Sequence, residues 1–382
     1  MKNKKYFCYE IYKNLSIVSH NGKLEYSPCC AFIGHVKTSS EFNLTDVWNS
    51  PEHLELKKCV ETDAHIPGCQ SCYSAEDAGT ESRRQGSKKL YEEYHKDTDT
   101  ELSGPTGIDY SVGNLCNLKC VICGPQNSSQ WIPDYQKLHP TVDIVSFQYK
   151  KNEQLEITDP DLLQNIKHVH FHGGGEPLLS KNHVRLLQKI QEVKGLSDVR
   201  VLYNTNATQT VSDEILQLWE KCKLIELYFS IDDIGARFDY QRTGANWHNV
   251  TATLDWFSAN MPHNHMFNVN CTWSYLNFFY LNEVWDWWDK NFSSNRYGDP
   301  TNLIFQKAVG DFEINHLSKS SHETLQNKFQ GYNNILPLVQ SLNVSEKPHS
   351  IFWKNISALD QVRGTDYKKI HPEWSKLLLK QK

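Results

Sequence analysis

Three cysteines lie close together in the stretch Asn114–Pro125, at positions Cys116, Cys120 and Cys123. Three thiolates at these intervals can hold three corners of an iron–sulfur cube and leave the fourth iron without a protein ligand. A cluster with a vacant iron can bind and reduce a substrate directly, whereas a cluster with four thiolates mainly transfers electrons. The motif alone also fits an incomplete zinc site or three structural thiols. The spacing therefore indicates catalytic chemistry, which a second motif has to support.

The second motif is a strand that ends in glycines. The apolar stretch 167–172 runs into Gly173, Gly174 and Gly175, followed by Glu176, and such glycines let a ligand approach the backbone closely. Together the two motifs resemble the radical S-adenosylmethionine (SAM) enzymes, over residues 104–310. In that family the Cys-x3-Cys-x2-Cys cluster binds SAM and the Gly-Gly-Glu strand end holds the methionine amino group. The resemblance implies a SAM-binding [4Fe–4S] cluster and SAM itself.

The resemblance also implies roles for residues that follow the later strands. Glu176 is expected to accept a hydrogen bond from the SAM ammonium, with Gly174 and Gly175 beside it. Candidates for the SAM ribose and carboxylate are Asn204, Asn206, Ser230 and Asp232, and Arg242 is a partner for a carboxylate of SAM or substrate. For the asparagines a turn is an equally good interpretation, and for Ser230 and Asp232 a helix cap.

A second group of cysteines lies in the first ninety residues. A β-hairpin over 14–27, with the tight-turn pair Asn21–Gly22, brings Cys8 close to Cys29, and Cys69 with Cys72 can complete a four-thiolate site. Zinc and an iron–sulfur cube both fit four cysteines. The order of these cysteines resembles the twitch module, the shortened SPASM domain that holds an auxiliary [4Fe–4S] cluster, although twitch modules generally follow the barrel. Cys30 is the alternative to Cys29, and Cys59 is predicted to pack in a helix.

Alternating strand and helix patterns predict an α/β fold, a partial (β/α)6 TIM-like barrel. The expected strands are 106–112, 167–172, 198–204, 224–231, 266–274 and 301–308, and the expected helices are 178–193, 212–221, 247–260 and 280–290. We expect three parts: an auxiliary-cluster domain over 1–100, the barrel over 101–310 and a helical extension over 311–382 without strands. Short helices are expected at 351–359 and 374–379. The cysteine motif 116–123 and the motifs 173–176, 204–207 and 230–232 then follow the carboxyl ends of successive strands, where barrels place reactive groups.

Composition agrees with an enzyme of the cytoplasm. The chain has 382 residues, 39% of them hydrophobic and 12% aromatic, which is ample for a core. No apolar run is long enough to span a membrane and the start lacks the hydrophobic region of a signal peptide. Eleven cysteines in a reducing compartment are better interpreted as metal ligands than as disulfides. A net charge of −5 does not favour general nucleic-acid binding.

Activity is inferred from the family. The resemblance implies one-electron reduction by a flavodoxin- or ferredoxin-type donor, cleavage of SAM and removal of a hydrogen atom from a substrate. A peptide or protein side chain is the first expectation, by analogy with SPASM and twitch maturases; a sugar, amino acid or nucleotide is the alternative, and a non-enzymatic iron–sulfur protein is the third. Cys271 is a candidate hydrogen-atom donor of the epimerase type, and Cys222 a weaker one. The alternating His168, His170 and His172 are expected to line a polar barrel interior.

Overall fold

A single mixed sheet organises the computed structural model, which describes residues 4–20, 23–39, 44–77, 79, 81–94, 104–111, 113–147, 160–292, 303–347 and 349–379. Its strand order is β3-β2-β1-β4-β5-β6-β7-β8-β9. The strands are β1 (Asn14–His20), β2 (Lys23–Ser27), β3 (Lys37–Ser39), β4 (Gly107–Ser111), β5 (His168–Phe171), β6 (Arg200–Thr205), β7 (Leu224–Ser230), β8 (His265–Trp273) and β9 (Leu303–Lys307). Strands β4 to β9 are all parallel to their neighbours, which confirms the predicted α/β class and the partial barrel.

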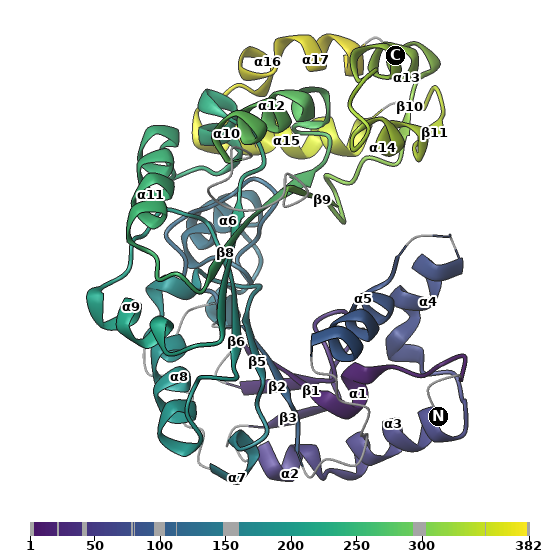
Figure 1. Cartoon of the computed structure of the whole chain (residues 1–382). Helices are drawn as coiled ribbons and strands as arrows, with labels where there is room; N and C mark the ends of the chain where they lie inside the picture. The colour runs from purple at the N-terminus through teal and green to yellow at the C-terminus, as the bar shows by residue number, and fades with distance from the viewer. Residues whose placement is uncertain are drawn as a thin grey trace.

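Helices cover the outer side of this curved sheet, and part of the N-terminal segment lies on the opposite side (Figure 1). The helices of the barrel are α6 (Ile132–Leu138), α7 (Pro160–Leu163), α8 (Lys181–Val193), α9 (Asp213–Glu220), α10 (Gly235–Gln241), α11 (Trp247–Asn260) and α12 (Leu281–Phe292). Those of the N-terminal segment are α1 (Tyr9–Lys13), α2 (Leu44–Trp48), α3 (Pro51–Glu61), α4 (Gln70–Asp77) and α5 (Arg83–Lys89). Figure 1 shows α8, α9 and α11 along one side of the strands and α4 and α5 on the other.

Strand β6 shows why the barrel has a polar interior. Its burial alternates along the strand, so that Val201 and Tyr203 are buried in the apolar core while Arg200, Leu202 and Asn204 line a cavity on the other face. Period-two alternation of this kind separates two faces of a sheet. The apolar face packs against helices such as α8, whose Leu186, Leu187 and Ile190 are buried. This alternation agrees with the expected polar barrel interior. His168 and His170 of β5 line the same cavity.

The N-terminal segment extends the barrel sheet. The predicted hairpin is present as β1 and β2, paired antiparallel, while the turn pair Asn21–Gly22 lies outside the described residues. Strand β1 also pairs with β4 in parallel, with Asn14 opposite Gly107. The segment therefore shares its hydrogen-bonded sheet with the barrel, and the boundary expected near residue 100 lies outside the described residues. A helix-rich part of the segment has a small core of its own, formed by residues of α1, α3 and their neighbours.

The C-terminal extension consists mainly of helices, as expected. They are α13 (Lys319–Lys328), α14 (Leu336–Gln340), α15 (Ser350–Arg363), α16 (Tyr367–Ile370) and α17 (Pro372–Leu379), and α15 and α17 contain the two predicted helices. The expectation of no strands was wrong, because β10 (His316–Leu317) pairs with β11 (Asn343–Val344) in parallel. Two-residue strands are too short to produce an alternating pattern in the sequence. None of the helices within the described ranges is both long and apolar enough to cross a membrane.

Candidate functional site

The three cysteines of the first motif lie on the loop that follows β4. Cys120 is buried, and Cys116 and Cys123 are half-buried. The backbone amide of Leu118 donates to Cys116 Sγ at 3.4 Å, so the loop turns back on this thiol. A hydrogen bond between the thiols of Cys120 and Cys123 lowers the pKa of Cys123, and burial raises that of Cys116 to about 11. The structure therefore brings the three thiols together, as the spacing predicts.

Two glycines hold the strand end of the second motif against this loop. Gly174 and Gly175 have positive φ angles of 50° and 77°. A Cβ atom at either position would lie 2.7 Å from the carbonyl oxygen of Gly113, at the start of the cysteine loop. Only glycine adopts this backbone at low cost and permits so close an approach. The glycines thus serve the packing of two loops, in addition to the ligand contact that the resemblance implies.

Glu176 is held in place by three donors. The carboxylate accepts hydrogen bonds from Thr205 Oγ1 at 2.8 Å, from the amide of Asn206 at 2.7 Å and from the amide of Leu178 at 3.1 Å. The residue is 1% exposed, and burial raises the pKa of the carboxyl group despite these donors. Carboxylate oxygens can accept several hydrogen bonds, so capacity for a further donor remains. This fixed acceptor beside the cysteine loop is suited to orienting a ligand ammonium.

The asparagines predicted to contact SAM have local partners. Asn206 Oδ1 accepts a hydrogen bond from the amide of Thr208 at 3.0 Å, as the turn interpretation predicts. The Nδ2 atom of Asn206 lies 3.8 Å from Cys116 Sγ. Asn204 Oδ1 lies 3.3 Å from His170 Nε2 within the barrel. Ser230 is half-buried at the end of β7. The structure places these residues at the strand ends, where the hydrogen bonds of Asn206 support the local turn.

Asp232 and Arg242 form a buried ion pair beside the cysteines, with Nη2 and Oδ2 2.8 Å apart. The other carboxylate oxygen of Asp232 accepts from the amide of Thr272 at 2.8 Å. Arg242 Nε is buried without a hydrogen-bond partner among the described residues. The hydrogen bond with Cys123 and burial raise the pKa of Cys120, which the positive charge of Arg242 opposes, and the same charge helps to lower the pKa of Cys123. A cation near thiols favours the thiolate, which is the form that ligates metals.

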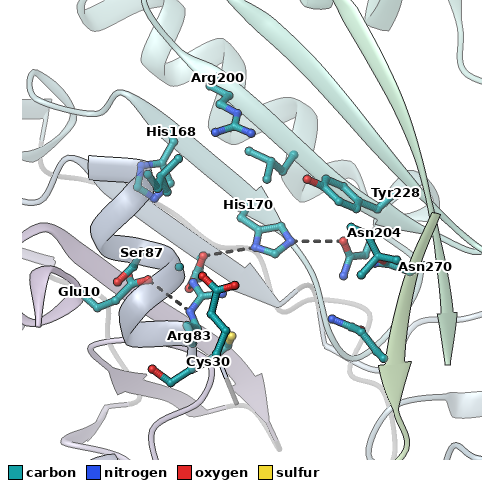
Figure 2. Close-up of a pocket in the computed structure, with 18 of the residues that line it drawn as sticks. Glu10, Cys30, Arg83, Ser87, His168, His170, Arg200, Asn204, Tyr228 and Asn270 are labelled. Atoms are coloured by element: carbon teal, nitrogen blue, oxygen red, sulfur yellow. Dashed lines mark hydrogen bonds and ion pairs between the residues drawn. The ribbon is translucent and has the colours of Figure 1, made fainter. Parts of the chain in front are cut away.

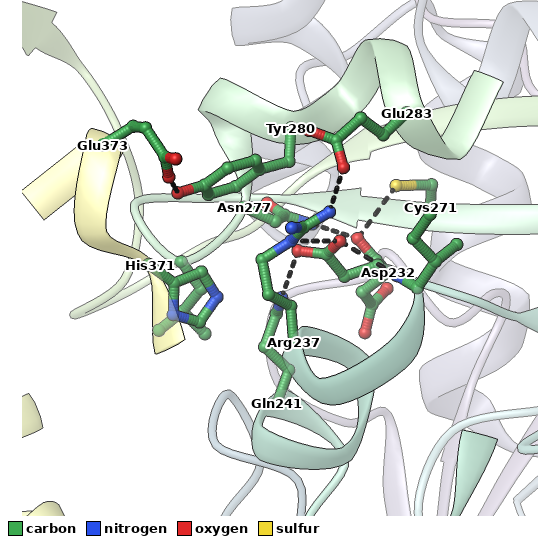
Figure 3. A network of polar contacts seen from close by, with 12 residues as sticks. Asp232, Arg237, Gln241, Cys271, Asn277, Tyr280, Glu283, His371 and Glu373 are labelled. Atoms are coloured by element: carbon green, nitrogen blue, oxygen red, sulfur yellow. Dashed lines mark hydrogen bonds and ion pairs between the residues drawn. The ribbon is translucent and has the colours of Figure 1, made fainter. Parts of the chain in front are cut away.

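Cys271 is placed away from the barrel cavity. Its thiol is fully buried and donates to the backbone carbonyl of Asp232 at 3.6 Å, as Figure 3 shows. The same region holds a polar network that the sequence analysis did not identify, in which Asp233 accepts from Arg237 at 2.9 Å. Burial raises the pKa of Asp233 to about 7. The D-D pair that follows β7 is the one signal in the sequence that indicates it. Cys222 is buried in the apolar core.

The cysteines of the N-terminal segment converge from separate elements. Cys8 precedes α1, Cys29 lies shortly after β2, Cys69 directly precedes α4, and Cys72 lies in the first turn of α4. The thiols of Cys69 and Cys72 both act on the pKa of Cys8, and Cys8 in turn acts on that of Cys29, so Cys8 lies within electrostatic reach of the other three. Burial is the main cause that raises the pKa of Cys8 and Cys29. Such buried thiols, gathered without a disulfide, suit metal ligation.

A cavity of about 820 Å³ lies between the N-terminal segment and the interior of the barrel (Figure 2). Its walls carry charges of both signs. Arg83 of α5 pairs with Asp109 of β4 at 2.7 Å and with Glu10 at 3.3 Å. Although burial opposes it, Arg83 holds the pKa of Asp109 well below its usual range, while burial raises that of Glu10 to about 7. The other lining residues include His168, His170, Arg200, Tyr228, Asn270 and Phe305.

Comparisons with known proteins found one family profile and several partial likenesses. The Radical SAM superfamily profile matches residues 110–270. A GTP 3',8-cyclase of Limosilactobacillus fermentum is 29% identical over 121 residues, which are 31% of this chain and 30% of the relative. The solved structure of anSMEcpe with bound AdoMet has a TM-score of 0.39 at 17% identity, over 63% of this chain and 61% of that one. Streptococcus suis SuiB bound to S-adenosylmethionine has a TM-score of 0.36 at 13% identity, over 91% and 72%.

The match to the cyclases is partial, because it spans only 30% to 39% of the length of the first two. It falls short of establishing their activity for this chain. The profile match, however, covers the cysteine loop, the glycine turn, Asp232 and Arg242, which are the residues brought together in the structure. A domain of this family implies a [4Fe–4S] cluster and SAM, and the three thiols beside a buried arginine fit such a cluster. Residues 110–270 therefore form a radical SAM domain.

Proposed function

We propose that this chain is a radical SAM enzyme that takes a hydrogen atom from a substrate bound in the cavity between the N-terminal segment and the barrel. The observation that carries the proposal is the convergence of Cys116, Cys120 and Cys123 with Arg242 and Glu176 at the carboxyl ends of the strands. The SAM-bound cluster supplies a 5′-deoxyadenosyl radical once a flavodoxin- or ferredoxin-type donor has reduced it. The residues of the chain supply binding, orientation and exclusion of water.

Each protein group has a defined task in this proposal. The three thiolates hold the cluster, and three ligands leave one iron for SAM. Glu176, fixed by Thr205 and the amides of Asn206 and Leu178, orients the methionine ammonium. Gly174 and Gly175 let the backbone approach the bound molecule. Arg242 balances the negative charge of the thiolates, and Asp232 holds Arg242 in position. Asn204, Asn206 and Ser230 are proposed to contact the remainder of SAM.

The cysteines of the N-terminal segment are proposed to hold a second, auxiliary [4Fe–4S] cluster. Cys8, Cys29 and Cys72 supply buried thiols and Cys69 a half-buried one, which fits the twitch-like order of the sequence. With four thiolates, this cluster is suited to accept or deliver an electron and not to bind a substrate. Cys59, which packs against the small N-terminal core, is not needed as a ligand.

A peptide or protein side chain is the first candidate substrate, from the resemblance to SPASM and twitch maturases. Helix α5 and the loop that carries Cys30 cover part of the cavity, so a single side chain could enter while the rest of a peptide stays outside. Cover of this kind limits the access of water to a reactive radical. Return of a hydrogen atom by Cys271 is not supported by the geometry, because its thiol faces the Asp232 carbonyl.

A small polar metabolite is the second candidate, and two observations favour it. The cavity volume of about 820 Å³ lies in the range of small-molecule sites, and its walls carry Glu10, Arg83, Asp109 and Arg200. The curated relatives that match about a third of the chain are named for a reaction of GTP. A substrate with both anionic and hydrogen-bonding groups would match these walls.

The direct test is formation of 5′-deoxyadenosine from SAM by anaerobically reconstituted, dithionite-reduced protein. The matched control is the triple variant Cys116→Ala, Cys120→Ala and Cys123→Ala, because it removes one set of thiols and leaves the other. Product from the unaltered protein and none from the variant would support the proposal. Product from both proteins would overturn it, as would failure of the reconstituted protein to bind SAM in an equilibrium titration.

A further inference from the structure

The adjacent cysteines Cys29 and Cys30 turn in different directions. Cys29 is buried near Cys8, with the other thiols of the N-terminal segment. Cys30 instead lines the cavity, where Figure 2 shows it beside Arg83. One cysteine of the pair can therefore serve the proposed auxiliary cluster, whereas the other is left for a different site.

Two side chains near Cys30 are of types that can ligate a metal ion. Ligand atoms of Cys30, Asp109 and His172 all lie within 4.8 Å of one another, a combination of sulfur, oxygen and nitrogen. Asp109 comes from β4, and His172 directly follows β5, the neighbouring strand. Three residues from three separate parts of the chain thus meet at one point on the cavity wall.

His172 provides an independent indication of a missing ligand. Its Nε2 atom is buried and has no hydrogen-bond partner among the described residues. A buried polar atom without a partner is destabilising, so such atoms are uncommon and usually have a reason. A metal ion bound to this ring would remove that cost.

Asp109 is oriented by groups that do not belong to the three. Arg83 Nη2 lies 2.7 Å from Asp109 Oδ2, Asn14 Nδ2 donates to the same oxygen at 3.1 Å, and His170 Nδ1 lies 3.5 Å from Oδ1. Ligating carboxylates are typically held by hydrogen bonds of this kind. Asp109 and Arg83 carry opposite charges, so the site becomes anionic only when a bound cation displaces the thiol proton of Cys30.

We propose that Cys30, Asp109 and His172 bind a single zinc ion on the wall of the cavity. Mixed sulfur, nitrogen and oxygen ligands are those that Zn²⁺ takes, and three protein ligands leave one position for water or substrate. The open position lies at the cavity wall, where the ion can bind an oxygen, nitrogen or sulfur atom of the substrate and orient it. This site goes beyond the proposed function, and it shares no ligand with either proposed iron–sulfur cluster.

The test is zinc K-edge X-ray absorption on the full chain after both iron–sulfur clusters have been reconstituted and zinc chloride has been added and then dialysed away. Iron has no absorption edge at this energy, so the clusters do not obscure the zinc signal. We expect about one zinc per chain, with a single sulfur at about 2.3 Å and nitrogen or oxygen atoms at about 2.0–2.2 Å. Zinc surrounded by four sulfurs would place it at Cys8, Cys29, Cys69 and Cys72 and overturn the proposal, as would absence of retained zinc.

Single variants identify the ligands. Cys30→Ser and His172→Gln should each weaken zinc binding by at least about tenfold, with iron content unchanged. Cys59→Ser is the matched control, since it removes a thiol of the same segment from outside the three, and it should retain zinc. Cys30→Ser protein with undiminished zinc affinity would refute the assignment. The readout needs no SAM cleavage, so its failure and failure of the proposed function are separate results.

Discussion

The two groups of thiols proposed to hold clusters are built in opposite ways. Cys116, Cys120 and Cys123 lie on one loop of the radical SAM domain, so the local backbone alone brings them together. Cys8, Cys29, Cys69 and Cys72 come from three places in the N-terminal segment and come together only when α1, β2 and α4 are in position. Three thiols in the first group would leave one iron of a cluster without a protein ligand, whereas the second group is proposed to supply four ligands. Local sequence spacing therefore defines the group of thiols proposed to bind SAM through a cluster, whereas the fold brings the N-terminal group of thiols together.

The strongest challenge to this comparison is removal of thiols from the N-terminal group. In the double variant Cys69→Ser and Cys72→Ser, iron content should fall by about half, because one of two four-iron clusters is lost. The change in iron per chain is measured after anaerobic reconstitution, together with 5′-deoxyadenosine formation. SAM cleavage should persist, because Cys116, Cys120 and Cys123 are unaltered. Loss of all iron would show that the two groups do not assemble independently.

A smaller effect is expected from the arginines beside each group. Arg242→Gln leaves Asp232, which is 2% exposed, as a buried charge without its partner, and should lower the free energy of unfolding by about 3–5 kcal/mol. Arg84→Gln in the N-terminal segment should cost less, about 1–3 kcal/mol, because Arg84 and Glu76 are partly exposed at 13% and 19%. Urea unfolding of both variants measures the difference.

The double variant Arg242→Gln with Asp232→Asn serves as the control for that measurement. Replacing the carboxylate by an amide removes the unpaired charge, so part of the lost stability should return. If the double variant is less stable than the Arg242→Gln variant by the full cost that Asp232→Asn has on its own, the two side chains do not interact and the ion pair lacks the role described here.

Much of the barrel could be predicted from the sequence, and the physical reason is local. The expected strand 224–231 and helix 247–260 agree with β7 and α11 to within a residue, because both have continuous apolar patterns. The three cysteines on one loop were also predictable. The pairing of β1 with β4 was not, because β1 and β4 are separated by more than eighty residues and no pattern in either strand specifies its neighbour.

The cavity was beyond prediction for a similar reason. Arg83 and Asp109 belong to a short helix and a buried strand, and their contact depends on how α5 packs over the barrel. Cys30 was assigned only as an alternative to Cys29, because adjacent residues point in different directions and the sequence does not show which faces the barrel. The orientation of the two thiols requires the three-dimensional structure.

One buried histidine in each region allows a test of whether the regions unfold together. Burial lowers the pKa of His53 in α3 and of His183 in α8 to about 4. Above pH 6.5 the folded and unfolded states are both neutral at these rings, so their contribution to stability is fully present. As the pH falls from 6.5 to 4, the unfolded state takes up protons that the folded state does not, and stability is lost.

Each histidine should reduce the free energy of unfolding by about 2 kcal/mol between pH 7 and pH 5. His53→Gln and His183→Gln should each remove that share of the pH dependence in urea unfolding. Because β1 and β4 are paired in one sheet, we expect a single transition in both variants. Two separate transitions, with His53→Gln altering only one of them, would mean that the N-terminal segment unfolds as a unit of its own.

The smallest effect is predicted for Cys59, the cysteine that lies between the N-terminal ligands in the sequence. It is half-buried in α3 and packs at the edge of the small core that contains Phe7 and Cys8. Cys59→Ser replaces a thiol by a hydroxyl of similar size, so the cost should be below about 1 kcal/mol, and iron content should not change. Elemental analysis and urea unfolding measure both quantities. A fall in iron as large as that of the Cys69 and Cys72 double variant would instead make Cys59 a ligand in place of Cys8, since both thiols border the same core. The four proposed ligands of the N-terminal segment would then have to be reassigned.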